Sequence, residues 1–402
     1  MDRAAIDAGT VVTQGDAVRI EIRIASVQVM GYMCPAAVGS TWRTGVVTTG
    51  TNLQHRLRET VGTSVPGIAV AVVDPDGIRD AVAVGMANLG SGRPASTEMV
   101  CPWFSMTKIV TATAAMRLHE RGVLDLDAPM FPHVAQMGRL RPSTDAATIT
   151  ARHLLSHSGG LANPIPVGWI HPPGQAGPDP DTFLDGLLSK HGKLRFAPGT
   201  RSSYSNLGTL ILGAAMANLT HTPFTDLVQQ DVLEPLGMRS TGFAYSPALE
   251  AHAATGYHPR RSPMRYLLHR WVIGPPTGRW LSLNRFLLDG QAYGGLIGTV
   301  TDAARFVRMH LRDGELDGVQ ALQTDSARAM RDIRIDGKRF DLGLGWFRPS
   351  NARSADPPFV EHLGGGAGFF NVIRIYPTRD VGIAVMGNAT KYDIDAVAAL
   401  AL

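Results

Sequence analysis

The sequence has few of the features that mark specialised protein classes. It contains only two cysteines, Cys34 and Cys101, which rules out a disulfide framework and the paired-cysteine spacing of zinc sites. No apolar run reaches the roughly 18 residues that a membrane-spanning helix needs. Its 38 basic and 34 acidic residues are spread along the chain without a Lys/Arg block. Neither nucleic acid nor a membrane is therefore an expected partner.

What the chain does have is the composition of a globular protein. Its 402 residues are 44% hydrophobic and 18% charged, which suffices to bury one large core or two modest ones. An apolar patch at residues 27–33 faintly resembles a signal peptide, but it lies far from Met1 and is interrupted by Gln28. We expect residues 1–50 to be a poorly ordered extension. The expected location is cytoplasmic, with a secreted or periplasmic protein as the alternative.

Hydrophobic patterns predict strands at both ends of the remaining chain. Strands are expected at residues 67–73, 81–84, 358–362, 370–376 and 381–386, with a closing helix at 393–402. The first two strands flank Asp74-Pro75-Asp76-Gly77, a turn in which proline fixes φ and glycine accepts positive φ. Such hairpins predict an antiparallel sheet to which both ends of the chain contribute.

Between these ends, helical periods dominate and strands are scarce. Helices are expected at residues 150–157, 180–190, 206–219, 223–233 and 301–311, the last capped by Thr301 and Asp302. The pattern predicts an α+β fold, an antiparallel sheet flanked by helices, with an inserted all-helical lobe and the active site between them. The domains would be residues 51–122 with 290–402, and residues 123–289.

The stretch with the clearest chemical potential is Ser105-Met106-Thr107-Lys108, which opens a helical run. Residues three apart on a helix are neighbours, so Ser105 and Lys108 can share a proton. Serine becomes a nucleophile when a base takes its proton, and lysine is such a base when burial lowers its pKa. A serine before a helix can equally be a plain N-cap, so the motif needs support from the rest of the chain.

That support comes from the order of several further segments, and together they resemble the serine β-lactamase and penicillin-binding-protein superfamily. Tyr204-Ser205-Asn206 matches its Tyr-x-Asn motif. Family-like segments also occur at residues 153–161, 196–199, 234–238, 294–296 and 365–369. Within the superfamily, the chain is most similar to the class C β-lactamase-like branch with its β-lactamase-fold (family VIII) carboxylesterases. The resemblance implies the fold of β-lactamases and DD-peptidases.

The third family motif departs from the pattern of lactamases. Where they usually carry Lys-Thr-Gly, this chain has His362-Leu363-Gly364. Lysine supplies a fixed positive charge near a substrate carboxylate, whereas histidine is largely neutral at pH 7 unless its neighbours raise its pKa. Anionic β-lactams should lose attraction, while neutral esters need no such charge. We expect protonation of His362 toward pH 5 to restore part of the missing charge.

The resemblance assigns roles to these residues. Ser105 attacks the acyl carbon, and either Lys108 or Tyr204 takes its proton, since a tyrosine beside an ammonium group is held closer to phenolate. Asn206 orients Lys108 and the acyl group, and it can also cap a helix. The oxyanion hole is formed by the backbone N–H groups of Ser105 and Gly365, with Gly364 allowing close backbone approach.

The resulting hypothesis is a serine hydrolase, a carboxylesterase for short to medium acyl esters of small molecules. The alternatives are a β-lactamase, a D-aminopeptidase or amidase, or a slowly turning-over penicillin-binding sensor. No Gly-x-Ser-x-Gly elbow occurs, which argues against an α/β-hydrolase. His153 and His157 have the spacing of a metal pair but no third ligand, so packing is the favoured interpretation. No metal or cofactor is expected, and monomer and homo-oligomer both stay open.

One further stretch, residues 266–280, is unusually aromatic and irregular. A loop at this point of the fold would lie over the cleft, where apolar walls suit an acyl or alcohol group. A short helix is the alternative interpretation.

Overall fold

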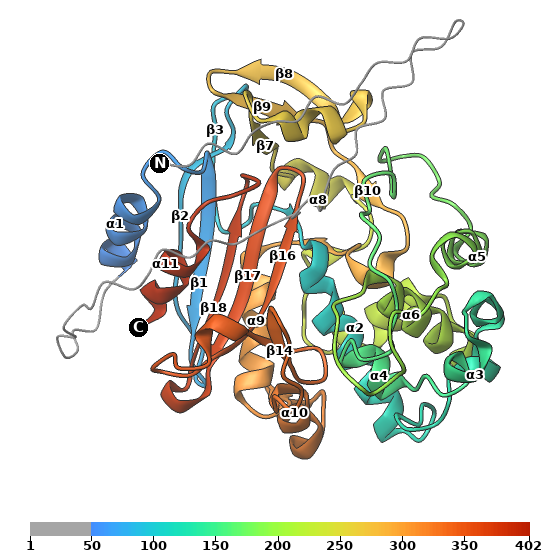
Figure 1. Ribbon diagram of the computed structural model, residues 1–402. Helices are drawn as coiled ribbons and strands as arrows, with labels where there is room; N and C mark the ends of the chain where they lie inside the picture. Colours follow the sequence, from blue (N-terminus) through green and yellow to red (C-terminus); the bar gives the residue numbers. More distant parts are fainter. Residues whose placement is uncertain (1–49) are drawn as a thin grey trace, which may run out of the picture. The chain divides into compact units, whose positions relative to one another are not determined.

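The structure is a computed structural model that describes residues 50–402 (Figure 1). The extension expected over residues 1–50 lies outside the described residues except for Gly50, which begins helix α1 (Gly50–Val61). No helix within the described part is both long and apolar enough to cross a lipid bilayer.

An eight-stranded antiparallel sheet runs through the protein, and its strands come from both ends of the described chain. In order across the sheet, they are β14 (Phe340–Leu342), β15 (Phe347–Pro349), β16 (Val360–Gly366), β17 (Phe369–Tyr376), β18 (Val381–Gly387), β1 (Gly67–Val73), β2 (Ile78–Asn88) and β3 (Arg93–Pro94). Val70 of β1 lies between Val82 of β2 and Val385 of β18. The prediction that the first and last strands share one antiparallel sheet is confirmed.

Both faces of the central strands are buried, which explains the uninterrupted apolar run of β1. Successive side chains of a strand point to opposite faces. Ile68 and Val70 pack in the layer that contains α1 and α11 (Ile394–Ala398). Ala69 and Ala71 belong to the larger core on the other face, where α2 (Thr107–Glu120) and α9 (Val300–Leu311) lie. Small alanines on this face let α9 approach the sheet closely.

Residues 123–289 form a region rich in short helices, but the lobe is not all-helical. Its helices are α3 (Ser143–Ala146), α4 (Ala151–Leu155), α5 (Pro180–His191), α6 (Asn206–Thr220), α7 (Phe224–Val228) and α8 (Pro247–His252). It also contains β5 (Ile170–His171) and β6 (Thr241–Gly242), and a three-stranded antiparallel sheet of β7 (Gly256–Pro259), β9 (Trp280–Leu283) and β8 (Ile273–Thr277). Strands of two to five residues are too short to show a period in the sequence.

Short strand pairs complete the architecture. β4 (Cys101–Pro102) and β6 pair with β11 (Ile297–Gly298), β5 pairs with β10 (Leu287–Leu288), and β12 (Glu315–Leu316) pairs with β13 (Val319–Gln320). Helix α10 (Thr324–Arg331) precedes β14. The pairings β4–β11 and β5–β10 join segments that are far apart in the sequence, and β4 leads into the turn that carries Ser105.

The stretch at residues 266–280 is not an open loop. It spans parts of two 3₁₀ turns, Pro263–Leu267 and Arg270–Val272, and then strand β8. Tyr266 is 76% exposed and Leu267 is 43% exposed, so neither side chain is a buried wall of a cleft.

Helix α9 begins differently from the prediction. Its N-cap is Thr299, whose hydroxyl accepts a hydrogen bond from the Asp302 amide at 3.3 Å. The buried Asp302 carboxylate instead accepts from the Ser240 amide and the Thr241 hydroxyl, both at 2.8 Å. The expected cap by Thr301 and Asp302 is therefore wrong. Asp302 instead connects α9 to Ser240 and to Thr241, the first residue of β6.

Candidate active site

Ser105 lies in a rigid turn at the start of α2. The turn is a 3₁₀ helix, Phe104–Met106, that continues into α2. Phe104 has a φ of 48°, a left-handed conformation that is strained for a bulky residue and is typical of functional sites. Its ring is 6.2 Å from that of Phe286 and 6.4 Å from that of Phe369. This packing holds the strained residue in place and leaves Ser105 half-buried beside it.

Lys108 follows one turn later, and its amine lies against the serine hydroxyl. Nζ donates a hydrogen bond to Ser105 Oγ at 3.1 Å and to the Tyr293 carbonyl oxygen at 2.7 Å. The side chain is buried, and this burial lowers the pKa of Lys108 well below its usual range. A neutral amine at this position can accept the Ser105 proton.

Tyr204 is hydrogen-bonded to Ser105, and its ring lies 5.0 Å from Lys108 Nζ. Burial raises the pKa of Tyr204 above its usual value, and the hydrogen bond with Ser105 offsets this only in part. The expectation that the tyrosine is held closer to phenolate is therefore wrong. Tyr204 directly precedes Ser205, the residue that caps α6, so the helix cap fixes the backbone next to Tyr204.

That cap is Ser205, not Asn206. The Ser205 hydroxyl accepts from the Gly208 amide at 3.2 Å and donates to the Ala162 carbonyl at 2.7 Å. Asn206 is the first helical residue, and its amide donates to Asn163 Oδ1 at 3.0 Å. Within the described residues, the buried Asn206 Oδ1 has no hydrogen-bond partner. An unsatisfied buried acceptor of this kind is available to a donor on a bound molecule.

His362 lies on β16 and is buried against Phe347, with ring centroids 4.7 Å apart. Its Nδ1–H donates to the Leu363 carbonyl at 2.9 Å, while Nε2 is buried and has no partner among residues 50–402. Burial is the main cause that lowers the pKa of His362 well below its usual value, with smaller electrostatic contributions from the neighbouring Lys108 and His157. The expected protonation of His362 toward pH 5 is therefore wrong.

The glycines after His362 let strand β16 lie directly on the Ser105 turn. A Cβ atom at Gly364 would stand 2.0 Å from the Trp103 carbonyl oxygen, and one at Gly366 would stand 2.4 Å from the Phe104 ring. Gly365 between them is half-buried and pairs with Phe370 of β17. The Ser105 amide, second in its helix, has no intrahelical partner. The oxyanion hole formed by Ser105 and Gly365 stays a prediction that this packing favours.

Two residues of the site were not predicted as such: His157, for which packing was the favoured interpretation, and Tyr293. The ring of His157 lies 4.5 Å from that of Tyr204. Its carbonyl accepts from the Ser203 amide at 2.9 Å, and its Nδ1 accepts from the Ser205 amide at 3.3 Å. Burial, and then the nearby Lys108, lowers the pKa of His157 to about 3. The neutral imidazole thus positions Tyr204. In the sequence, the feature that could have indicated this role is the place of His157 in the family-like segment 153–161.

Tyr293 contributes its backbone to the site, which no side-chain motif can reveal. Its carbonyl oxygen accepts the hydrogen bond from Lys108, and its ring packs against that of Trp169, with ring centroids 5.5 Å apart.

His153 has a structural role, because its Nδ1 accepts a hydrogen bond from the Thr150 amide in a capping box. No group of three or more His, Cys, Asp or Glu side chains within the described chain has the geometry to hold a metal ion.

Comparisons with known proteins agree with this geometry. The family model described as Beta-lactamase matches residues 53–402. The D-alanyl-D-alanine-carboxypeptidase/endopeptidase AmpH of Escherichia coli K12 is 26% identical over 335 residues, covering 81% of this chain and 80% of that protein. Esterase EstB of Burkholderia gladioli is 33% identical over 183 residues, covering 44% of this chain and 46% of EstB.

Among solved structures, the D-amino acid amidase of Ochrobactrum anthropi in complex with D-phenylalanine has the same fold. Its TM-score is 0.71 at 20% identity, over 87% of this chain and 97% of the amidase. The turn that presents Ser105, the buried Lys108 at its hydroxyl and the match over nearly the whole described chain lead to one conclusion. The chain belongs to the beta-lactamase family and is a serine hydrolase.

Proposed function

We propose that this protein is a carboxylesterase that hydrolyses short to medium acyl esters of small molecules through an acyl-enzyme at Ser105. The observation that carries the proposal is the buried Lys108 amine, 3.1 Å from Ser105 Oγ and with a lowered pKa. A buried lysine whose pKa is lowered gives up its proton more readily, which suits it as the general base for a serine nucleophile.

The pKa directions favour a division of labour between the two candidate bases. Lys108 takes the proton from Ser105 as Oγ attacks the acyl carbon. Tyr204, whose pKa is raised by burial, stays a phenol and donates its proton to the leaving alkoxide. The proton then held by Lys108 returns to Tyr204 through the shared hydrogen bonds. A water molecule attacks the acyl-enzyme with the neutral Lys108 again as base, and Ser105 regains its proton.

The preference for esters over β-lactams is supported by the third motif. His362 is neutral and buried, so the position that carries a lysine cation in lactamases offers no fixed charge to a carboxylate. Neutral acyl esters need no such charge. The 33% identity with a protein named as an esterase agrees with this choice.

A second candidate is hydrolysis of D-amino-acid amides or peptides, and one observation favours it. The buried Asn206 Oδ1 lacks a partner within the described residues, and a substrate amide N–H would satisfy it, whereas an ester has no donor at that point. AmpH, one of the relatives that match most of the chain, is named as a carboxypeptidase/endopeptidase.

A substrate panel separates these candidates. We expect the purified full chain to hydrolyse p-nitrophenyl acetate and butyrate with a kcat/KM at least a hundredfold above that for nitrocefin or D-phenylalanine amide. Ser105→Ala is the matched control and should lose all of these activities. A higher kcat/KM for the amide would favour the second candidate, and a higher one for nitrocefin would make the protein a β-lactamase.

A further inference from the structure

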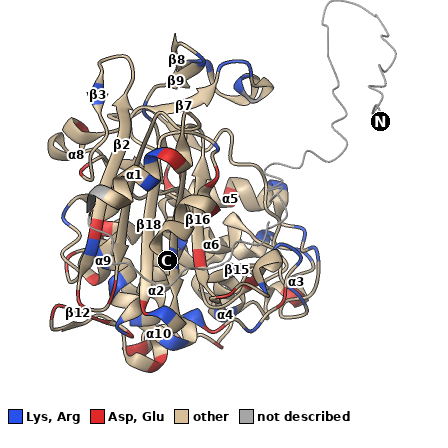
Figure 2. Cartoon of the chain, turned by 90° about the vertical axis from the view of Figure 1, so that its left-hand side faces the viewer, with Lys and Arg blue, Asp and Glu red and all other residues tan. Residues whose placement is uncertain are grey.

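The small sheet beside the active site carries an unusual concentration of positive charge. We call residues 259–280 the arginine flap; they comprise the last residue of β7, both 3₁₀ turns, β8 and the first residue of β9. The flap contains five arginines and neither Asp nor Glu. They are Arg260, Arg261, Arg265, Arg270 and Arg279. Figure 2 shows the corresponding blue stretches around β8 and the turns next to it.

None of these five arginines forms an ion pair with a carboxylate in the described part of the chain, although several other arginines there do. Arg260, Arg261 and Arg270 are exposed. Arg265 stacks on Tyr266 and Arg279 on Trp280, at 4.6 and 4.9 Å from the ring centroids. Guanidinium groups without a carboxylate partner, held in fixed positions, are suited to bind phosphate in a bidentate manner.

Exposed apolar groups lie among these charges. Tyr266 is 76% exposed and Leu267 is 43% exposed, and both lie in the first 3₁₀ turn of the flap. Leu268 and Trp271, which follow in the sequence, are partly buried and pack against the main core. This packing holds the turn that carries Tyr266 and Leu267 in place. Phosphate-binding arginines around an exposed tyrosine and leucine match the headgroup region of an anionic bilayer.

We propose that the arginine flap binds the surface of a bilayer that contains anionic phospholipids. The arginines contact lipid phosphates, and Tyr266 and Leu267 enter the headgroup region. The inference goes beyond the proposed function and departs from the expectation of no membrane partner. That expectation rested on the lack of an apolar span, which peripheral binding does not need.

The flap is connected to the catalytic turn. Strand β9 leads to Phe286, whose ring contacts that of Phe104, the residue before Ser105. Asn284, which also follows β9, donates from its side chain to the carbonyl of Trp271 within the flap at 2.7 Å. A bilayer bound at the flap would therefore lie on the side of the protein where the Ser105 turn is found.

Vesicle co-sedimentation tests the proposal with the full chain. We expect binding to vesicles of phosphatidylcholine with about 30% phosphatidylglycerol and not to phosphatidylcholine alone, with binding weakened by salt as for any surface charge interaction. The triple variant Arg260→Gln/Arg261→Gln/Arg270→Gln should bind at least tenfold more weakly. It should keep wild-type kcat/KM for the water-soluble p-nitrophenyl acetate, so a failure of the esterase proposal would be seen separately.

A matched control removes the same charge elsewhere. Lys190, Lys193 and Arg195 are exposed and form no ion pair within the described chain, so Lys190→Gln/Lys193→Gln/Arg195→Gln changes the net charge equally. This variant should bind vesicles like the wild type. An equal loss in both variants would mean non-specific attraction and would overturn the proposal.

A second readout reports contact with lipid directly. In Tyr266→Trp, the new indole should give a blue-shifted fluorescence component with anionic vesicles, which brominated lipid should quench. Binding of the wild type to soluble heparin with no binding to anionic vesicles would identify a polyanionic polymer as the partner and overturn the lipid proposal. Vesicle binding without quenching would overturn the insertion of residue 266.

Discussion

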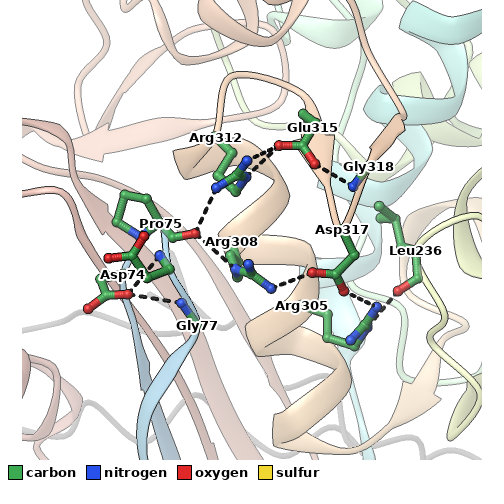
Figure 3. A network of polar contacts seen from close by, with 11 residues as sticks. Asp74, Pro75, Gly77, Leu236, Arg305, Arg308, Arg312, Glu315, Asp317 and Gly318 are labelled. Carbon is green, nitrogen blue, oxygen red and sulfur yellow. Dashed lines mark hydrogen bonds and ion pairs between the residues drawn. The ribbon is translucent and has the colours of Figure 1, made fainter.

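The arginines of helix α9 and the polar side chains around Ser105 differ in how fully their hydrogen bonds are satisfied. In the α9 network, Arg305 and Arg308 both donate to Asp317, at 2.9 and 2.7 Å, and Arg312 donates to Glu315 at 2.6 Å (Figure 3). Arg308 and Arg312 also donate to the Pro75 carbonyl, each at 3.1 Å. The network thus fastens α9 to the turn between β1 and β2.

Around Ser105 the opposite holds. Within the described chain, Asn206 Oδ1, Tyr293 Oη and His362 Nε2 are buried without partners, and the Lys108 amine is buried with a lowered pKa. An unsatisfied buried polar group costs about 1–3 kcal/mol. We infer that the α9 network stabilises the fold, whereas the unpaired buried groups around Ser105 lower the stability of the fold and are retained for their reactivity. Substitutions in the two regions should therefore separate activity from stability.

The largest effect is expected for the proton-transfer pair. Lys108→Ala and Tyr204→Phe should each lower kcat for p-nitrophenyl butyrate by about 10²–10⁴-fold, the usual contribution of a positioned acid or base. The double variant should lose much less than the product of the two factors, because residues that act as a unit fail together. Steady-state kinetics with circular dichroism as a folding control measures this. Two small and additive defects would contradict the assignment.

The second expected effect is on the pH profile of kcat/KM. Lys108 acts only as the neutral amine, and burial lowers its pKa below the ordinary 10.5. Activity should therefore fall as the pH drops through this lowered pKa and stay high above it. His362 should add no second step near the ordinary histidine pKa of 6.5, since burial lowers its pKa well below that value. Activity that rises on acidification would contradict Lys108 as the base.

A smaller change, in stability alone, is expected in the α9 network. Arg308→Gln removes the bonds to Pro75 and Asp317 from a side chain that is 16% exposed. We expect a loss of about 1–2 kcal/mol in the free energy of unfolding, since the bonds are partly shielded from water. The measurement is urea unfolding, with kcat/KM for the ester unchanged. A loss of activity without a loss of stability would contradict the proposal that the α9 network affects stability and the Ser105 site affects activity.

Lys108→Met should give the reverse, an inactive but more stable protein. Because the folded-state pKa of Lys108 is lowered, the unfolded chain keeps the lysine proton up to a higher pH than the folded chain does, and below the ordinary lysine pKa this difference favours unfolding. The penalty disappears as the pH rises toward 10.5, the ordinary lysine value. The rise in Tm should thus be larger at pH 7 than at pH 10. A variant less stable than the wild type at both pH values would show that burial of the Lys108 amine does not destabilise the folded protein.

The smallest effect concerns His362→Lys. An added cation should lower KM for nitrocefin at least severalfold, since Coulomb attraction at ~4 Å is worth about 1 kcal/mol even at the dielectric constant of water. Turnover of p-nitrophenyl butyrate should not improve. Unchanged KM for nitrocefin in a folded variant would mean that the third motif does not set the preference for esters.

Sequence patterns predicted five of the eight strands of the large sheet, because strands such as β1 and β18 are long apolar runs, but they missed β3, β14 and β15, which have two or three residues. The family could be identified because the Ser105 and Tyr204 motifs are short, continuous segments. The three-stranded sheet at residues 256–283 escaped prediction since its strands have four or five residues and depend on pairing. The α9 cap was misassigned because Thr299 and Thr301 are equally suitable in sequence.

Within the site, residue types were predictable and electrostatic states were not. Whether Tyr204 is nearer phenol or phenolate depends on the balance of burial against neighbouring charge, and burial prevails only in the folded chain. The same holds for His362, whose neighbours Lys108 and His157 come from distant segments. Tyr293 acts through its carbonyl, which every residue possesses, so no pattern could single it out.

The central claim, that Ser105 is the nucleophile, is tested most directly by a fluorophosphonate probe followed by peptide mass mapping. We predict one probe per chain, attached to the peptide that contains Ser105, with loss of esterase activity in proportion to labelling. Ser105→Ala should take up no probe and show no turnover while keeping the wild-type unfolding curve. Labelling of another residue, or ester hydrolysis that survives Ser105→Ala, would contradict the account.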